Sequence, residues 1–185
     1  MPEIKIVPYK PDWPAEYERL AAALKNALGE LALRIDHIGS TAVPGLAAKD
    51  RIDIQISVGA LTPELIESLT NHGYIHKPGL EDTPRGENPD PGDWRKLVFV
   101  TPDDERPANI HLREWGRPNQ RYALLFRDFL RAHPISRDGY AKVKEELARL
   151  HPHDKDVYYA VKEPVFDIIH EAMEMWAEYT GWNPA

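Results

Sequence analysis

RIDHIGSTAVPGLAAKDRIDIQISV, residues 34–58, is the stretch that decides the fold. Its second half alternates apolar and polar residues, which predicts a β-strand over residues 51–58. The apolar face carries isoleucine and valine, and the opposite face carries Arg51, Asp53, Gln55 and Ser57. A carboxylate in such a strand is costly unless it is paired, hydrogen-bonded or bound to a cation, or unless its face is open to water. Asp53 therefore indicates either a ligand cleft or the wet face of an amphipathic strand.

The composition limits the functions that this cleft could serve. The chain has 185 residues, no Cys and a net charge of -7. Without Cys there are no disulfides, no thiolate metal sites and no Cys nucleophile, so a metal site must use His and carboxylates. The negative charge argues against binding long nucleic acid, which requires neutralisation of phosphates. With no long apolar run and no signal-like start, we expect a cytoplasmic protein without a membrane partner.

The remaining sequence predicts alternating strands and helices, followed by helices alone. The expected strands are residues 3–8, 31–38, 51–58 and 74–77 and a hairpin formed by 94–102 and 107–115. The expected helices are residues 12–29, 62–73, 119–132, 136–150 with Ser136 as N-cap, and 156–181. Residues 78–93, rich in Pro, Gly and acids, predict a long mobile loop.

The last helix carries an apolar series that we expect to face the core: Val157, Val161, Val165, Ile168, Ala172, Met173 and Trp176. Pro164 should kink or divide it. The fold class is therefore α+β, a small mixed β-sheet flanked by helices with a C-terminal helical segment packed on it. We expect one domain over residues 1–185, with a mixed αβ core (1–115) and a helical tail (116–185).

Gly39 and Ser40 follow a predicted strand and open a segment that could begin with a short helix. Backbone N–H groups and a hydroxyl at such a point can bind phosphate. The alternative is that Ser40 or Thr41 only caps a helical turn.

Gly39-Ser40 followed, after twelve residues, by Asp53-Ile54-Gln55-Ile56 resembles the motif of the nucleotidyltransferase superfamily. More narrowly, HIGSTAVPGLAAK and IDIQISV resemble the GrpB family, which is placed in that superfamily. Further similarities run along nearly the whole chain: Trp13, ANIHLRE around His111, FRDFLRAHP from Phe126, Tyr140, Lys144, Tyr158 and Lys162.

The resemblance implies a polymerase-beta-like nucleotidyltransferase fold. Gly39, Ser40 and the adjacent Thr41 would bind phosphate, and Asp53 would bind a divalent metal, Mg²⁺ or Mn²⁺, as cofactor. Its partners would be a nucleoside triphosphate and an unidentified acceptor. Carboxylates in such enzymes hold the cations that bridge phosphate oxygens.

The sequence departs from the superfamily motif at Gln55, where a second acid is expected. A neutral amide oxygen is a poorer Mg²⁺ ligand than a carboxylate. A set formed by Asp53, Gln55 and His111, joined by His37, would suit Mn²⁺, Zn²⁺ or Fe²⁺ better, or bind no metal. We take Asp53, Gln55 and His111 as the candidate catalytic residues. A hydrogen-bonded structural role is the alternative for His111 and the favoured role for His37.

Cations from the chain itself could also meet a phosphate. Lys49 precedes the Asp53 strand, and Lys144 and Lys162 coincide with the GrpB pattern, so these three are candidate phosphate-binding residues. Arg113 and Arg127 lie on elements that could fold over the sheet. His151 and His153 resemble a metal cluster, but their place in a Pro-containing connector favours loop capping.

Two classes of function follow from these residues. The first is a nucleotidyltransferase with a degenerate metal site, which transfers a nucleoside monophosphate from a triphosphate to an acceptor. The alternative is a catalytically inactive nucleotide- or phosphate-binding regulatory module. Phosphoester hydrolysis at a His and Asp metal site would use the same residues.

Overall fold

The chain folds around a five-stranded mixed β-sheet, described here from a computed structural model that covers residues 3–86 and 89–184. The strands are β1 (Arg34–Ile38), β2 (Ile52–Val58), β3 (Ile75–His76), β4 (Leu97–Val100) and β5 (Ala108–Glu114). Their order across the sheet is β1-β2-β5-β4-β3. β2 and β5 pair in parallel, and every other neighbouring pair is antiparallel. The structure thus confirms the predicted α+β class.

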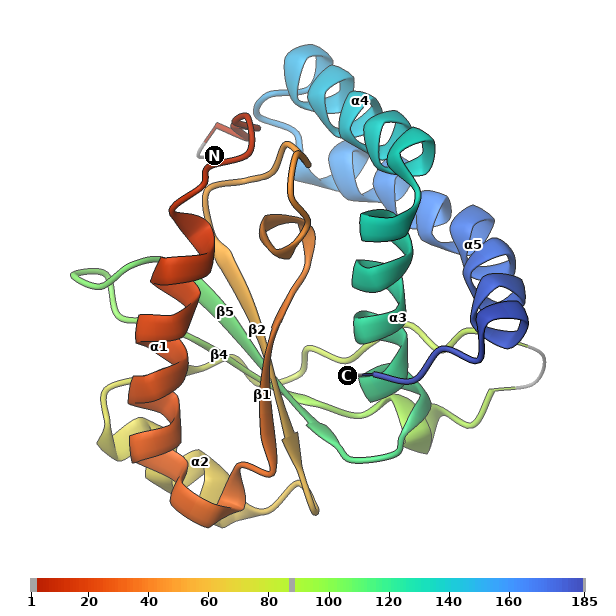
Figure 1. Cartoon of the computed structure of the whole chain (residues 1–185). Helices are drawn as coiled ribbons and strands as arrows, with labels where there is room; N and C mark the ends of the chain where they lie inside the picture. The colour runs from red at the N-terminus through yellow and green to blue at the C-terminus, as the bar shows by residue number, and fades with distance from the viewer. Residues whose placement is uncertain (1–2, 87–88, 185) are drawn as a thin grey trace.

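Helices cover both faces of this sheet (Figure 1). The helices α1 (Trp13–Leu28) and α2 (Pro63–Asn71) pack on the face that carries the isoleucines of β2. The helices α3 (Pro118–Ala132), α4 (Pro134–Leu150) and α5 (Lys155–Thr180) lie on the other side. Short 3₁₀ turns occupy Gly29–Leu31, Ser40–Ala42 and Pro91–Trp94. Among the described residues, no helix has the length and apolarity needed to cross a membrane.

Two large apolar cores, together with a smaller cluster around Ile4, Leu147 and Tyr158, result from this layering. The first joins α1 and α2 to the sheet and includes Trp13, Leu24 and Ile54, each fully buried. The second joins the three C-terminal helices to the segment after β1, through residues such as Leu46 and Met173. Polar side chains gather between the sheet and the helices α3, α4 and α5.

Several predicted elements differ from the observed ones. Residues 3–8 add no strand to the sheet: Val7 forms an isolated bridge with Ala48, and the Ile4 N–H donates to Pro152 O. The first sheet strand begins at Arg34, because Gly29–Leu31 form a 3₁₀ turn. The segment after Gly39 is only a three-residue turn. Helix α4 begins at Pro134 with His133 as N-cap, so Ser136 lies inside the helix and does not cap it.

The last helix differs in part from its prediction. Pro164 does not divide it, since α5 continues from Lys155 to Thr180 with Pro164 inside. The predicted apolar face is correct only in part: Met173 is buried and Val165 and Trp176 pack on the second core, but Val161 and Ile168 are 50% and 76% exposed. The buried residues of α5 are Met173, which was predicted, and Tyr158 and Ala177, which were not.

Candidate functional site

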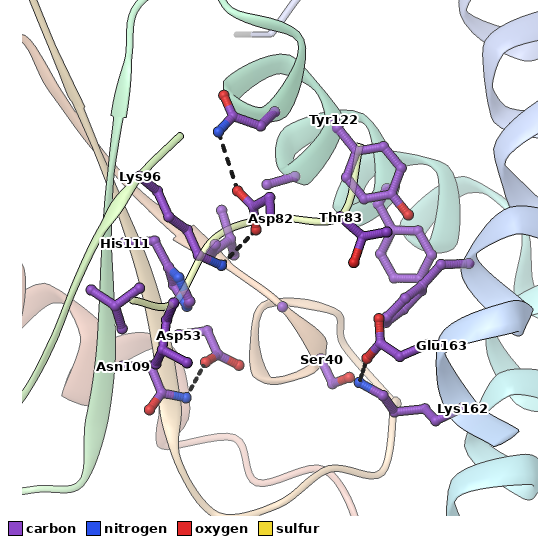
Figure 2. A pocket seen from close by; sticks show the side chains of 18 of the residues that line it. Ser40, Asp53, Asp82, Thr83, Lys96, Asn109, His111, Tyr122, Lys162 and Glu163 are labelled. Carbon is purple, nitrogen blue, oxygen red and sulfur yellow. Dashed lines mark hydrogen bonds and ion pairs between the residues drawn. The ribbon is translucent and has the colours of Figure 1, made fainter. Parts of the chain in front are cut away.

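A cleft of about 700 Å³ opens between the sheet and the C-terminal helices. Its sheet wall carries Asp53, Asn109 and His111, and its helical wall carries Lys162 (Figure 2). Lys144 of α4 also lines it. The turn at residues 39–41 and the segment 80–85 also contribute to its lining. Side chains that are distant in the sequence therefore meet in one hollow.

Strand register places Asp53 beside Asn109. The two residues are partners in the parallel β2–β5 pair, and Asn109 Nδ2 donates to Asp53 Oδ1 at 2.8 Å. Burial raises the pKa of Asp53, while the bond from Asn109 and the charge of Lys162 act in the opposite direction. Its side chain lines the cleft and is partly accessible. The acid in the strand is thus a cleft residue held by a neutral amide.

Gly39 makes room for this carboxylate. Its φ is +69°, and a Cβ atom built on it would lie 2.5 Å from Asp53 Oδ2 and 2.9 Å from Asp53 Cβ. Both the backbone conformation and the space require glycine here. The turn and the acid therefore form one tightly fitted unit at the cleft wall.

Ser40 meets Lys144 from helix α4. Lys144 Nζ donates to Ser40 Oγ at 2.8 Å and to Ala47 O at 2.5 Å, and it lies 4.5 Å from the centroid of the Tyr140 ring. Burial, followed by the nearby charge of Lys162, lowers the pKa of Lys144 to about 7. The ammonium group is thus held next to the serine hydroxyl at the edge of the cleft.

Lys49 and Lys162 lie near the same end of the cleft. Lys49 Nζ is 4.4 Å from the centroid of the Tyr158 ring, and burial lowers its pKa. Lys162 Nζ pairs with Glu163 Oε1 at 2.8 Å and lies 4.7 Å from the centroid of the Phe166 ring. The structure brings both predicted lysines to the cleft with Ser40 and Lys144.

Gln55 is placed differently. It is fully buried and does not belong to the described cleft lining. Its Oε1 accepts a hydrogen bond from Arg113 Nη1 at 2.7 Å, and its Nε2 donates to Gln120 O at 3.0 Å. The Gln55 amide thus holds the Arg113 guanidinium in place. Its oxygen accepts from this guanidinium and is not directed into the cleft.

His111 lines the cleft on the strand next to β2. Its Nδ1 is buried and has no hydrogen-bond partner among the described residues. Burial, with smaller effects from Arg113 and Lys96, holds the pKa of His111 well below its ordinary value. The imidazole is therefore neutral near pH 7.

His37 lies on the opposite face of the sheet from Asp53. It pairs with Ile54 in the β1–β2 register and stacks on Tyr17 of α1 with ring centroids 4.7 Å apart. Its Nε2 is 2.9 Å from Thr41 Oγ1, and burial lowers its pKa to about 4. The structure therefore separates His37 from the proposed metal set and directs the Thr41 hydroxyl to His37.

These placements do not fit a pair of Mg²⁺ ions. Two-metal sites need several carboxylates around one point. Within residues 3–86 and 89–184, no three His, Asp or Glu side chains are grouped to hold a metal. The neighbours of Asp53 are the amide of Asn109 and lysine side chains, not further carboxylates. The Gln55 oxygen accepts a hydrogen bond from Arg113, and His37 faces α1.

The remaining sequence candidates lie outside the cleft. Arg127 donates to His37 O at 3.1 Å and pairs with Asp128. His151 and His153 are in the connector between α4 and α5. None of the three belongs to the described cleft lining.

Other cleft residues were not predicted. Asp82, in the loop predicted to be mobile, pairs with Lys96 and Arg113. Tyr140 and Asn109 also line the cleft. Alternation along the strand places Asn109 and Arg113 on the same side as His111, which is a signal that could have found Asn109, but nothing in the loop composition indicates a role for Asp82.

The chain has a nucleotidyltransferase-like α+β fold. The structure of Cid1 in complex with its short product ApU matches 78% of this chain and 43% of that chain, with a TM-score of 0.51 and 14% identity. At this level of identity the likeness concerns the fold alone. It supports the architecture predicted from the Gly39-Ser40 and Asp53 motif.

The chain belongs to the GrpB family, whose model, described as GrpB protein, matches residues 3–172. The crystal structure of conserved protein GrpB from Enterococcus faecalis is 27% identical, with a TM-score of 0.75 over 93% of this chain and 99% of that chain. UPF0157 protein BH1888 of Halalkalibacterium halodurans is 38% identical, and the match covers 76% of this chain and 67% of that protein.

A longer relative is the dephospho-CoA kinase of Mycolicibacterium paratuberculosis, which is 42% identical over 98% of this chain. The match covers only 48% of that protein. The chain thus spans about half the length of the dephospho-CoA kinases that it matches.

Proposed function

We propose that the cleft binds the phosphate groups of a nucleotide, and that this binding relies on cations of the chain. The observation that carries the proposal is the charge of the cleft. Its described lining contains four acids, Asp53, Glu81, Asp82 and Glu163, against seven basic side chains: Lys49, Arg51, Arg85, Lys96, Arg113, Lys144 and Lys162. A basic cleft in a protein of net charge -7 favours an anionic ligand.

Ser40 and Lys144 are the residues that we assign to the first phosphate. The hydroxyl and the ammonium are already held 2.8 Å apart, so little further ordering is needed on binding. Lys144 has its pKa lowered to about 7, so an arriving phosphate would favour its protonated form. Lys49 and Lys162 lie close enough to share the remaining charge.

Nucleotidyl transfer is the second candidate function. Two observations favour it: the Asp53 side chain packs directly against the turn at Gly39, and the fold is similar to that of Cid1. The dephospho-CoA kinase name of the longer relatives also refers to a phosphorylated compound, but the chain matches only half of those proteins.

Thermal unfolding with nucleoside triphosphates tests the binding proposal, because a ligand of the native state raises Tm. The four common triphosphates would be titrated with Mg²⁺, with Mn²⁺ and with EDTA. We expect a rise of several degrees at saturating nucleotide without metal. Ser40→Ala should weaken binding roughly tenfold, as loss of one hydrogen bond to a charged group does. Failure of every triphosphate to shift Tm would overturn the proposal.

Asp53→Asn separates the two candidates. If cations of the chain hold the phosphates, removal of this negative charge leaves the nucleotide-induced shift intact or increases it. If Asp53 holds a metal for nucleotidyl transfer, the shift requires Mg²⁺ or Mn²⁺ and disappears in the variant. Incubation of α-labelled triphosphate with cell extract adds a direct test, since transfer releases pyrophosphate and labels an acceptor.

A further inference from the structure

The cleft contains a second cationic cluster, on the sheet side, which already holds a carboxylate. Asp82 accepts from Arg113 Nε at 2.7 Å and Nη2 at 3.0 Å, from Lys96 Nζ at 2.6 Å, and from Asn119 Nδ2 at 3.2 Å. We call Lys96, Arg113 and Asn119 the Arg113 cluster. Figure 2 shows Asp82 inserted between Lys96 and the helix that carries Asn119.

The Arg113 cluster is built on rigid elements. Arg113 lies on β5 and is only 6% exposed, and its third nitrogen donates to the buried Gln55 of β2. Asn119 lies in the first turn of helix α3, is 1% exposed and also donates to Arg95 O at 2.9 Å. These supports fix the guanidinium in the orientation that receives an oxyanion through two parallel bonds.

Asp82, in contrast, comes from a weakly held segment. None of the residues 77–86 is buried, and Leu80 is 53% exposed. The second attachment of this segment is Arg85, which pairs with Asp167 and Glu163 of α5 and lies over the rings of Tyr122 and Phe166. Without buried apolar side chains, this segment loses little hydrophobic burial when it opens, so the cost of opening lies mainly in its polar contacts. An anion that replaces Asp82 at the Arg113 cluster would offset much of that cost.

The charges explain why the position needs an anion. Burial alone would raise the pKa of Asp82, but Arg113 and Lys96 outweigh burial and hold it well below its ordinary value. Conversely, Lys96 and Arg113, whose side chains are 10% and 7% exposed, would remain as uncompensated cations if the carboxylate withdrew. Another oxyanion would then be strongly favoured at the same place.

We propose that the Arg113 cluster is an oxyanion-binding site of the cleft, which Asp82 fills in the free protein and which takes a phosphate or carboxylate group of the bound molecule when residues 80–85 move away. This assignment rests on the proposed function only in taking the cleft as the ligand site. With Ser40 and Lys144 at the other end, the cleft then suits a ligand with two separated anionic groups.

The test replaces the carboxylate of Asp82 by an ion from solution. Tm of Asp82→Ala would be measured against sodium phosphate and against sodium acetate, with sodium chloride at equal ionic strength as reference. We expect the variant to unfold several degrees below wild type, and phosphate or acetate to restore at least half of the loss. Wild type should gain much less, because its own carboxylate fills the site.

Two further variants make the result specific. Asp104→Ala removes an exposed acid from the β4–β5 turn and should show no anion-dependent recovery. Asp82→Ala combined with Arg113→Gln should lose the recovery that the single variant shows. Rescue by phosphate alone assigns the site to a phosphate group, and rescue by acetate alone assigns it to a carboxylate.

If Asp82→Ala does not fold, Asp82→Asn keeps the shape of the side chain and removes its charge. Its Tm should then rise with phosphate or acetate by several degrees more than that of wild type. A folded variant that responds to these anions no more than to chloride would overturn the proposal. Because the probes contain no nucleoside, this outcome is independent of whether nucleotides bind the cleft.

Discussion

At the scale of single residues, Gly39 and Asp53 constrain each other. Gly39→Ala adds a Cβ 2.5 Å from the Asp53 carboxylate and forces alanine into a positive φ. We expect a loss of at least about 2 kcal/mol in the free energy of unfolding, from backbone strain and overpacking together. Urea denaturation measures it.

Gly29→Ala is the matched control for this effect. Gly29 also has a positive φ, +53°, but a Cβ there meets nothing within 4 Å. It should therefore lose only the backbone contribution, about 1 kcal/mol. Equal losses in the two variants would show that contact with Asp53 does not constrain position 39.

Lys144 should make stability depend on pH. Burial lowers its pKa from 10.5 to about 7, so between these values the unfolded chain binds a proton that the folded protein does not. Stability contributed by this group therefore rises with pH across that interval, by up to about 1.4 kcal/mol per pH unit. The difference in unfolding free energy between wild type and Lys144→Met should grow from pH 7 to 9.

Lys142→Met serves as the reference in the same helix. Lys142 is exposed and pairs with Glu146 at 2.8 Å, and this interaction raises its pKa. Its variant should show no such growth over the same interval. A pH-independent difference for Lys144→Met would mean that the lysine is protonated in the folded protein throughout.

At the scale of elements, the face of α5 that packs is testable with two methionines. Met173 is fully buried, whereas Met175 is 71% exposed. Met173→Ala should cost about 2–4 kcal/mol of stability through lost burial and a cavity. Met175→Ala should change stability by less than about 0.5 kcal/mol. Comparable losses would indicate that α5 is rotated from its observed position.

The elements themselves were largely predictable, because alternation and turn residues act locally. The β2 strand was predicted from the alternating residues Ile52, Ile54 and Ile56, and the end of α1 was predicted from Gly29. The orientation of α5 was not predictable in this way. Apolar residues occur on more than one side of it, and only its packing against α3 and α4 selects Met173 over Ile168.

The polar face of β2, which carries Asp53, Gln55 and Ser57, shows that alternation also predicts the site only in part. The polar residues suggested either a solvent-exposed surface or a cleft, but in the structure only some of them reach the cleft and the others are buried. Gln55 and Ser57 are fully buried under α3, where Gln120 Nε2 donates to Ser57 Oγ at 3.1 Å. Asp53 alone of these three lines the cleft. Polar residues that satisfy one another in a buried layer cannot be told from solvated ones by alternation.

The loop acid Asp82 was missed for a related reason. The Pro and Gly residues correctly predicted that the described residues of this segment, 78–86 and 89–93, form no strand and no long helix. It did not predict that Asp82 would reach the cations of the cleft wall, since those contacts join residues 14 to 37 positions apart. Long-range ion pairs leave no local pattern in a sequence.

At the scale of the whole molecule, the cleft lies between the two large apolar cores, which have no described residue in common. One core fixes the sheet wall through α1 and α2, and the other fixes the helical wall through α3, α4 and α5. A ligand that spans the cleft contacts both walls at once. It should therefore stabilise segments that are far apart in the sequence, because opening of either wall would cost its contacts.

Hydrogen exchange with and without a nucleoside triphosphate can detect this coupling. We expect slower exchange in three segments together: residues 39–49 after β1, 109–113 of β5 and 158–166 of α5, which all contribute to the cleft lining. Ser40→Ala should reduce the protection in all three segments, because one weakened ligand lowers the occupancy of the whole cleft. Protection confined to one segment would place the ligand on a single wall, and the two halves of the molecule would then not act as one binding unit.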